Sequence, residues 1–158
     1  MGDWIEEGRK APAFTLESDE GGKISLQDFA GRPLVLYFYP KDDTPGCTKE
    51  ACSFREYGAE IRKLGAEVVG VSPDSIASHG KFRQKYHLDF PLLADPGHKV
   101  AERYGAWREK NMYGKKTMGI QRSTYLIDGE GKVAKVWKRV KVEGHSDQVI
   151  TALSALVS

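Results

Sequence analysis

The stretch that constrains the fold most is a run of apolar residues at positions 34–39, LVLYFY, which ends at Pro40. A strand that is buried on both faces reads as a continuous apolar run, whereas a half-exposed strand alternates between apolar and polar residues. Proline cannot donate to a sheet ladder and therefore closes such a strand. The run predicts a buried central strand, which other elements must cover.

Strands and helices alternate along the rest of the chain. From Ala51 to Ile61, apolar or small residues recur at helical spacing with charges between them, which predicts an amphipathic helix over residues 48–64. The other expected strands are 14–16, 23–25, 67–71, 91–94, 123–127 and 132–137, and the other expected helices are 75–86, 100–104 and 147–156. This order, which ends in a β-hairpin, predicts an α/β sandwich with a mixed sheet.

Composition places few further limits on the chain. Its 158 residues, 40% of them hydrophobic, suffice for one core, and we expect a single domain over residues 1–158. The net charge of +2 gives no reason to expect nucleic acid or an anionic membrane as a partner, and the basic run at 132–141, KVAKVWKRVK, alternates as a half-exposed strand does. Because no signal peptide and no stretch of membrane-spanning length is found, we expect a cytoplasmic protein.

Both cysteines lie within residues 42–52, DDTPGCTKEAC. Disulfides in the cytosol are usually transient and catalytic rather than structural. Cys47 follows Pro45 and Gly46 and precedes a helix, so we expect it in the first helical turn, where free N–H groups and the helix dipole favour a thiolate. The alternative is that Cys47 is a small buried apolar residue. Its place in a loop after a core strand favours a reactive thiol.

The spacing of Cys47 and Cys52 sets them apart within one helix. Five residues of α-helix separate two Cα atoms by ~9 Å, whereas a disulfide tolerates at most about 7 Å. Bonding the two thiols therefore requires the first turns of the helix to unwind. A two-electron oxidant could convert Cys47 to a sulfenic acid, with which Cys52 could then condense.

Metal and nucleotide sites are weaker alternatives. The plant-type iron–sulfur pattern also begins with this cysteine spacing, but it needs further cysteines and the chain has none. A zinc site would need histidines at ligand spacing, and the four histidines are scattered singly. We expect these residues at the surface or at helix ends: His79, His87, His98 and His145. No phosphate-binding glycine motif follows a strand, so we expect neither a metal nor a cofactor.

Several segments together resemble one family. Pro40, Thr44 and Cys47 have the spacing of the peroxiredoxin active-site motif, and FYPKDDTPGCTKEACSFRE at 38–56 is similar to the bacterioferritin comigratory protein, or peroxiredoxin Q, subfamily. The resemblance extends to three more segments: GRKAPAF at 8–14, MYGKKTMGIQRSTYLID at 112–128 and VKVEGH at 140–145. It therefore covers nearly the whole chain.

The resemblance implies a thioredoxin-like fold, with a central mixed sheet flanked by helices, and the reduction of hydrogen peroxide and organic hydroperoxides. It makes Cys47 the peroxidatic cysteine and Cys52 the resolving cysteine, joined in an intramolecular disulfide during turnover. Thioredoxin or a glutaredoxin-like dithiol would regenerate the thiols. The resemblance also favours a monomer.

Four more residues gain a role from the resemblance. Arg122 is always cationic, so it could favour the thiolate and orient the peroxide through its planar fork. The hydroxyl of Thr44 could accept from the peroxide and donate to the thiolate or the incoming oxygen, and Pro40 would shield the pocket. Without the motif, these three would be a surface ion pair, a turn residue and a strand end. For Glu50 two roles stay open: a helix cap or dipole partner, and a partner that orients Arg122.

Two other classes of function compete with a thiol peroxidase. A thiol–disulfide oxidoreductase acting on protein disulfides is the first, but thioredoxin-type sites have two residues between their cysteines, and this chain has four. The second is a redox-controlled binding or chaperone module, for which the sequence offers neither a methionine-rich stripe nor a large apolar patch.

Overall fold

The computed structural model describes residues 3–158, with the backbone alone at Met112. In chain order the elements are β1 (Thr15–Ser18), β2 (Lys23–Ser25), the 3-10 helix η1 (Leu26–Phe29), β3 (Leu34–Phe38), α1 (Pro45–Glu56), α2 (Gly58–Lys63), β4 (Glu67–Ser72), α3 (Ile76–Tyr86), β5 (Leu92–Ala94), α4 (Lys99–Tyr104), β6 (Trp107–Met112), β7 (Lys115–Ile120), β8 (Ser123–Ile127), β9 (Val133–Trp137) and α5 (His145–Val157). All the strands expected from the sequence, and the expected helices apart from 48–64, are confirmed to within two residues.

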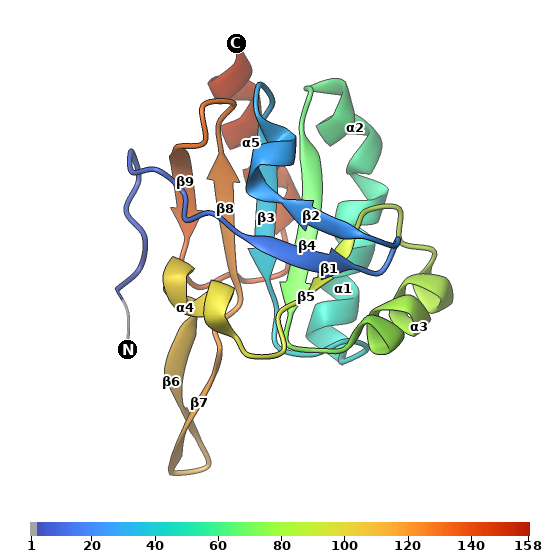
Figure 1. Ribbon diagram of the computed structural model, residues 1–158, viewed down its shortest axis with the longest axis vertical. Helices are drawn as coiled ribbons and strands as arrows, with labels where there is room; N and C mark the ends of the chain where they lie inside the picture. Colours follow the sequence, from blue (N-terminus) through green and yellow to red (C-terminus); the bar gives the residue numbers. More distant parts are fainter. Residues whose placement is uncertain (1–2) are drawn as a thin grey trace.

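A seven-stranded sheet organises the molecule (Figure 1). Its strand order is β2-β1-β5-β4-β3-β8-β9, with β3, β4 and β5 parallel to one another and the outer pairs antiparallel. The expected mixed sheet and the expected C-terminal hairpin of β8 and β9 are therefore confirmed.

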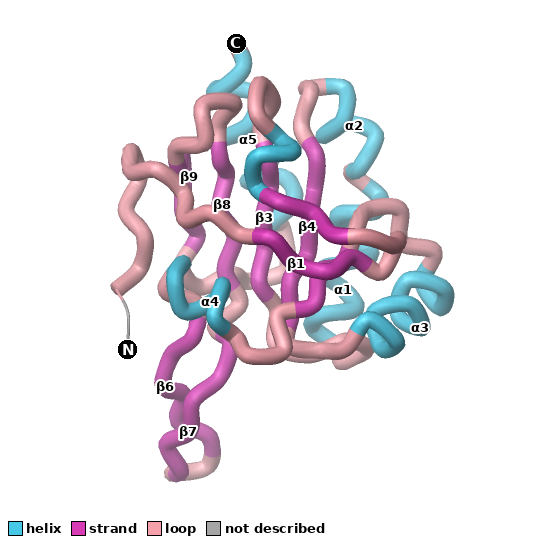
Figure 2. Tube along the Cα trace, viewed as in Figure 1, coloured by secondary structure: helices cyan, strands magenta, loops and turns pink. Residues whose placement is uncertain are grey.

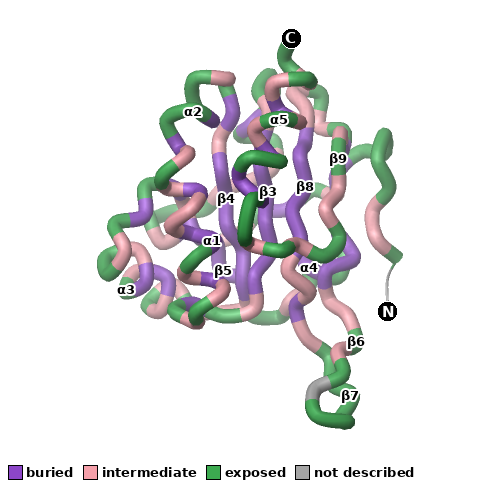
Figure 3. Tube along the Cα trace, turned by 180° about the vertical axis from the view of Figure 1, so that it is seen from behind, coloured by how far each residue is buried: buried purple, intermediate pink, exposed green. Residues whose placement is uncertain are grey.

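β3 lies near the middle of this sheet and is buried along its whole length. Successive side chains of a strand point to opposite faces, and here they enter two separate apolar clusters: Leu34, Leu36 and Phe38 on one face, and Val35, Tyr37 and Tyr39 on the other. The first face is covered by η1, α4 and the N-terminal segment, and the second by α1, α2 and α5. Figure 3 shows β3, β4 and β8 as the buried centre of the molecule. Burial on both faces explains the continuous apolar run.

The helix predicted over 48–64 is wrong in its bounds. It begins earlier, at Pro45, and is interrupted at Tyr57, where α1 gives way to α2. Glycine costs about 1 kcal/mol relative to alanine in a helix interior, and Gly58 stands at this break. The apolar positions continue across it because Phe54 and Ile61 pack into the same cluster, so the periodicity alone did not reveal the interruption.

The antiparallel hairpin of β6 and β7 was not predicted. Its residues are mostly polar and exposed, and its strands pair only with each other, so no apolar alternation marks them. In Figure 2 the hairpin stands apart from the main sheet, beyond the end at which β3 stops and β8 starts. Within residues 3–158, no helix has the length and apolar character needed to cross a membrane.

Candidate active site

The loop after β3 leads into α1 and brings Cys47 to a helix N-terminus. Proline is favoured at the first helical position because it has no N–H to leave unpaired, and α1 begins at Pro45 with Thr44 as its N-cap. Cys47 is therefore in the first turn, as expected, and is 2% exposed. The unpaired N–H groups and the positive end of the helix dipole favour an anion at this position. Both cysteines are free thiols.

Arg122 reaches this thiol from a distant part of the chain. β8 pairs antiparallel with β3, and Ser123 lies opposite Phe38, so the residue before β8 arrives where the loop after β3 begins. Nη2 of Arg122 donates to Cys47 Sγ at 3.2 Å, across 75 residues of sequence. The fold thus brings a permanent cation into direct contact with the sulfur.

The same guanidinium also binds Glu50. Nη1 of Arg122 donates to Glu50 Oε1 at 2.6 Å. Two roles were left open for Glu50, and this direct contact is the one required by the second, a partner that orients Arg122. Glu50 is 1% exposed, and within residues 3–158 its Oε2 has no hydrogen-bond partner. Burial raises the pKa of Glu50 to about 7, although the charge of Arg122 and its hydrogen bond act in the opposite direction.

Sequence reasoning missed two residues around this group. A Cβ on Gly46 would lie 3.1 Å from Arg122 Nη2, so glycine leaves the room in which the guanidinium sits. Tyr37 is 1% exposed, and its hydroxyl has no partner in the described part of the chain. Burial, followed by the negative charges of Glu50 and Cys47, raises the pKa of Tyr37 well above its ordinary value. Both positions looked purely structural in the sequence, as a turn glycine and a core aromatic residue.

Thr44 and Pro40 lie in the loop as the motif requires, but the hydroxyl of Thr44 is arranged differently from the expectation. Thr44 Oγ1 donates its proton to the carbonyl oxygen of Lys41 at 2.9 Å. In this arrangement it can accept a hydrogen bond from a ligand but has no proton left for the thiolate. Pro40 follows Tyr39, the buried residue after β3, and is itself half-buried.

Cys52 lies in the same helix as Cys47. It is half-buried, and the neighbouring Ser53 Oγ lies 2.5 Å from Ser146 Oγ of α5. Because both cysteines belong to one continuous α1, their Cα atoms are ~9 Å apart by helix geometry. With both thiols free, the arrangement is the one expected from the sequence, in which the intact helix keeps the thiols separate.

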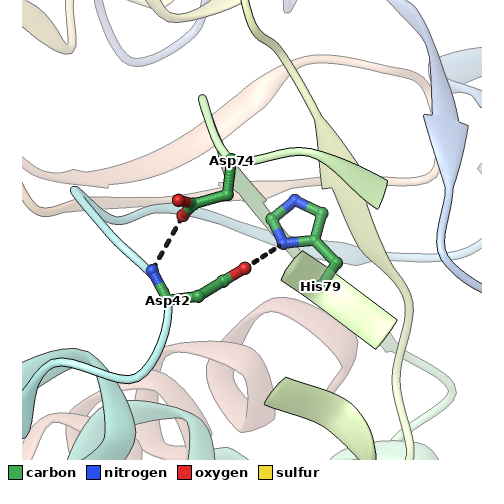
Figure 4. A group of neighbouring side chains, drawn as sticks. All are labelled: Asp42, Asp74 and His79. Atoms are coloured by element: carbon green, nitrogen blue, oxygen red, sulfur yellow. Dashed lines mark hydrogen bonds and ion pairs between the residues drawn. The ribbon is translucent and has the colours of Figure 1, made fainter. Parts of the chain in front are cut away.

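A buried group of polar residues holds the other end of the loop (Figure 4). Asp42 Oδ2 lies 2.7 Å from His79 Nδ1 and accepts from Ser78 Oγ at 2.8 Å, and Asp42 Oδ1 accepts from the hydroxyl of Tyr39 at 2.6 Å. Burial opposes a charge on His79, but the hydrogen bond and charge of Asp42 outweigh it, so the pKa of His79 is raised. His79 has no exposed surface and lies within α3, so the expectation of a surface or helix-end position was wrong for it.

Asp74 completes this group by accepting from the backbone N–H of Asp42 at 2.7 Å. Ligand atoms of Asp42, Asp74 and His79 lie within 4.8 Å of one another, which is close enough for a shared cation. The carboxylates and the imidazole already have hydrogen-bond partners in the protein, however. These hydrogen bonds fix the position of the loop.

Comparison with known proteins agrees with this geometry. The sequence model of the AhpC/TSA family matches residues 8–136. Peroxiredoxin Bcp of Bacillus subtilis is 50% identical over 149 residues, which cover 94% of this chain and 95% of the relative. Peroxiredoxin Bcp of Xanthomonas campestris is 47% identical over 135 residues, which cover 85% and 84%.

Solved structures of similar fold belong to the same group of proteins. The bacterioferritin comigratory protein of Xanthomonas campestris superposes with a TM-score of 0.91 at 41% identity, covering 97% of this chain and 100% of its own. PrxQ of Xylella fastidiosa superposes with a TM-score of 0.93 at 34% identity, covering 99% and 100%.

The fold and the site together define a peroxiredoxin, a thiol-dependent peroxidase with a thioredoxin-like fold, and the chain belongs to the AhpC/TSA family. Within that family, its relatives and its structural neighbours are the Bcp or PrxQ peroxiredoxins. Membership implies a hydroperoxide substrate and a thiol reductant.

Proposed function

We propose that Cys47 is the nucleophile that reduces hydroperoxides, and that its hydrogen bond with Arg122 at a helix N-terminus makes the thiolate available. The observation that carries this assignment is the 3.2 Å contact from Arg122 Nη2 to Cys47 Sγ. Only the thiolate is an effective nucleophile, and Arg122 favours this ionised form without being able to consume its proton.

The proposed reaction begins with the thiolate of Cys47 attacking one oxygen of the peroxide. A sulfur–oxygen bond forms, the O–O bond breaks, and Cys47 becomes a sulfenic acid. The other oxygen leaves with the electron pair of the broken bond and takes up a proton to become water or an alcohol. Arg122 and the backbone N–H groups at the start of α1 stabilise the charge that develops on the leaving oxygen.

The other residues of the loop orient the substrate in this proposal. The hydroxyl of Thr44 donates its own proton to the carbonyl oxygen of Lys41, so it accepts a hydrogen bond from the peroxide. Pro40 shields the pocket beside it, and Glu50 holds the guanidinium of Arg122 in place through the 2.6 Å ion pair. Because Glu50 holds Nη1 and Nη2 contacts Cys47, the guanidinium keeps a fixed orientation beside the sulfur that the peroxide approaches.

Cys52 is the proposed resolving residue. Its thiol condenses with the sulfenic acid of Cys47, which releases water and forms an intramolecular disulfide. A dithiol such as thioredoxin or a glutaredoxin-like protein then reduces this disulfide. A reducing compartment is needed for that cycle, so we propose a cytoplasmic location, and we propose that the chain acts as a monomer of a single domain.

The substrate range includes organic hydroperoxides in this proposal. The Xanthomonas campestris structure was described in connection with alkyl peroxide reduction activity, and this chain has the same fold. The alternative, a thiol–disulfide oxidoreductase, is not favoured because the relatives are peroxiredoxins.

Turnover with a thioredoxin system tests the division of labour between the two cysteines. Hydrogen peroxide and tert-butyl hydroperoxide are supplied in turn, and peroxide loss is followed together with reductant consumption. We expect Cys47→Ser to abolish both, whereas Cys52→Ser reacts once and stops as a sulfenic acid that a dimedone-type probe can trap. Full turnover by Cys47→Ser would contradict the assignment.

A further inference from the structure

The hairpin of β6 and β7 carries a lysine to which the proposed reaction assigns no role. Lys110 lies on β6, opposite Thr117 of β7, and is half-buried. A Cβ on Gly119 would lie 3.4 Å from Lys110 Cδ and 3.8 Å from Lys110 Cε. The stem of Lys110 therefore runs diagonally across the hairpin over Gly119, towards its base.

The base of the hairpin is where the active site begins. The backbone N–H of Gln121 donates to the carbonyl oxygen of Ala106 at 2.7 Å and closes the hairpin there, and Arg122 is the next residue. Figure 1 shows β6 and β7 projecting from the end of the sheet at which β3 stops and β8 starts. A side chain that leans towards this base leans towards Arg122 and Cys47.

The electrostatic surroundings of Lys110 agree with this direction. Burial lowers its pKa, the charge of Arg122 lowers it further, and the charge of Cys47 acts in the opposite direction. Lys110 thus lies within the field of both site residues. None of the salt bridges within the described residues involves it.

Arg122 and Lys110 therefore differ in the negative groups that neutralise their charges. The charge of Arg122 is shared between Glu50 and Cys47, whereas no carboxylate in the described part of the chain forms a salt bridge with Lys110. A negatively charged substrate would be repelled by the thiolate of Cys47, and a cation in the field of that sulfur, with no salt bridge to any described residue, offsets the repulsion.

We propose that Lys110 is a specificity-determining residue, which favours hydroperoxides that carry an anionic group such as a carboxylate over uncharged ones. This inference rests on the proposed peroxidase function of Cys47. Lys110 acts on the substrate through its charge, while the bonds that form and break remain those of the reaction above.

A matched pair of substrates tests the proposal: a tertiary alkyl hydroperoxide that carries a short carboxylate arm, and its uncharged methyl ester. The quantity measured is the ratio of the two second-order rate constants for oxidation of Cys47 in a Cys52→Ser background. We expect Lys110→Met to lower the carboxylate-to-ester ratio by roughly three- to tenfold, the size of a screened interaction of unit charges over several ångströms. Lys110→Arg, which keeps the charge, should retain most of the preference.

Lys115→Met is the matched control, because Lys115 is an exposed lysine of the same hairpin; its ratio should equal that of the wild type. Raising the salt concentration to about 1 M shortens the Debye length to about 3 Å and should bring the wild-type ratio close to that of Lys110→Met. An unchanged ratio in a folded Lys110→Met protein would overturn the proposal. Failure of the wild type to react with either compound would instead contradict the peroxidase function.

Discussion

At the scale of single residues, the guanidinium of Arg122 donates hydrogen bonds to two acidic side chains. Arg122 donates to Cys47 Sγ through Nη2 and to Glu50 Oε1 through Nη1. An ionised Glu50 neutralises part of the positive field, whereas a protonated Glu50 leaves more of it for the thiolate. The protonation state of Glu50 is therefore coupled to the charge that Arg122 presents to Cys47, and because burial raises the pKa of Glu50 to about 7, this coupling operates near neutral pH.

This coupling gives a pH-dependent prediction for Glu50→Gln. Since the pKa of Glu50 is raised from 4.5 to about 7 in the folded protein, the folded state holds this proton more tightly than the unfolded chain. The resulting stability is complete below the unfolded value and is lost as the pH rises through about 7. Glutamine does not titrate, so between pH 5 and 8 the free energy of unfolding of the variant should rise relative to the wild type by roughly 2–4 kcal/mol.

Denaturant unfolding at the two pH values measures this difference. Glu56→Gln is the control, because Glu56 is an exposed glutamate of the same helix, and its difference from the wild type should stay nearly constant. A constant difference for Glu50→Gln as well would show that Glu50 is ionised throughout this range and that Arg122 outweighs its burial.

At the scale of elements, α1 carries both cysteines and must change shape for them to bond. The helical separation of ~9 Å exceeds the limit of about 7 Å for a disulfide. The side chain of Ser53 contacts Ser146 of α5, and Phe54 packs in the cluster between α1 and the sheet. These contacts hold α1 from Ser53 onward, so the unwinding should be confined to the turns between the two cysteines.

Amide exchange provides the test of this unwinding. We expect the amides of residues 48–54 to exchange faster in the oxidised protein than in the reduced one, because opening of these turns removes their helical hydrogen bonds. The amides of α5 serve as the internal reference and should keep their protection. Equal protection of residues 48–54 in both redox states, with the Cys47–Cys52 disulfide confirmed by mass mapping, would contradict the unwinding.

At the scale of the whole molecule, the sequence predicted those features that depend on neighbouring residues, such as a buried strand and a helix start. The apolar run at 34–39 predicted β3 because burial on both faces leaves no polar position, and Pro45-Gly46 predicted the helix start that holds Cys47. The motif resemblance named Arg122, whose contact with Cys47 depends on the pairing of β8 with β3. Spacing along the sequence carries no information about such a distant contact.

Other parts of the site depend on packing that no local pattern expresses. The buried ring of His79 contacts Asp42 and Tyr39 through Nδ1 and the carbonyl oxygen of Leu93 through Nε2, and these partners come from distant segments of the chain. The hairpin of β6 and β7 lacks apolar alternation, since its strands pair only with each other. The hydrogen bond from Thr44 to Lys41 depends on the path of the loop and reverses the donor role that the sequence suggested for the hydroxyl.

The measurement that tests the account most directly is the single-turnover reaction of Cys47 with peroxide in Arg122→Met, in a Cys52→Ser background. Methionine keeps much of the apolar stem but removes the charge and the planar fork. We predict that the second-order rate constant of this step falls by roughly 10²–10³-fold, as on the loss of a donor to a developing oxyanion. An unchanged rate constant in the folded variant would place Arg122 outside the reaction and contradict the central role given to its contact with Cys47.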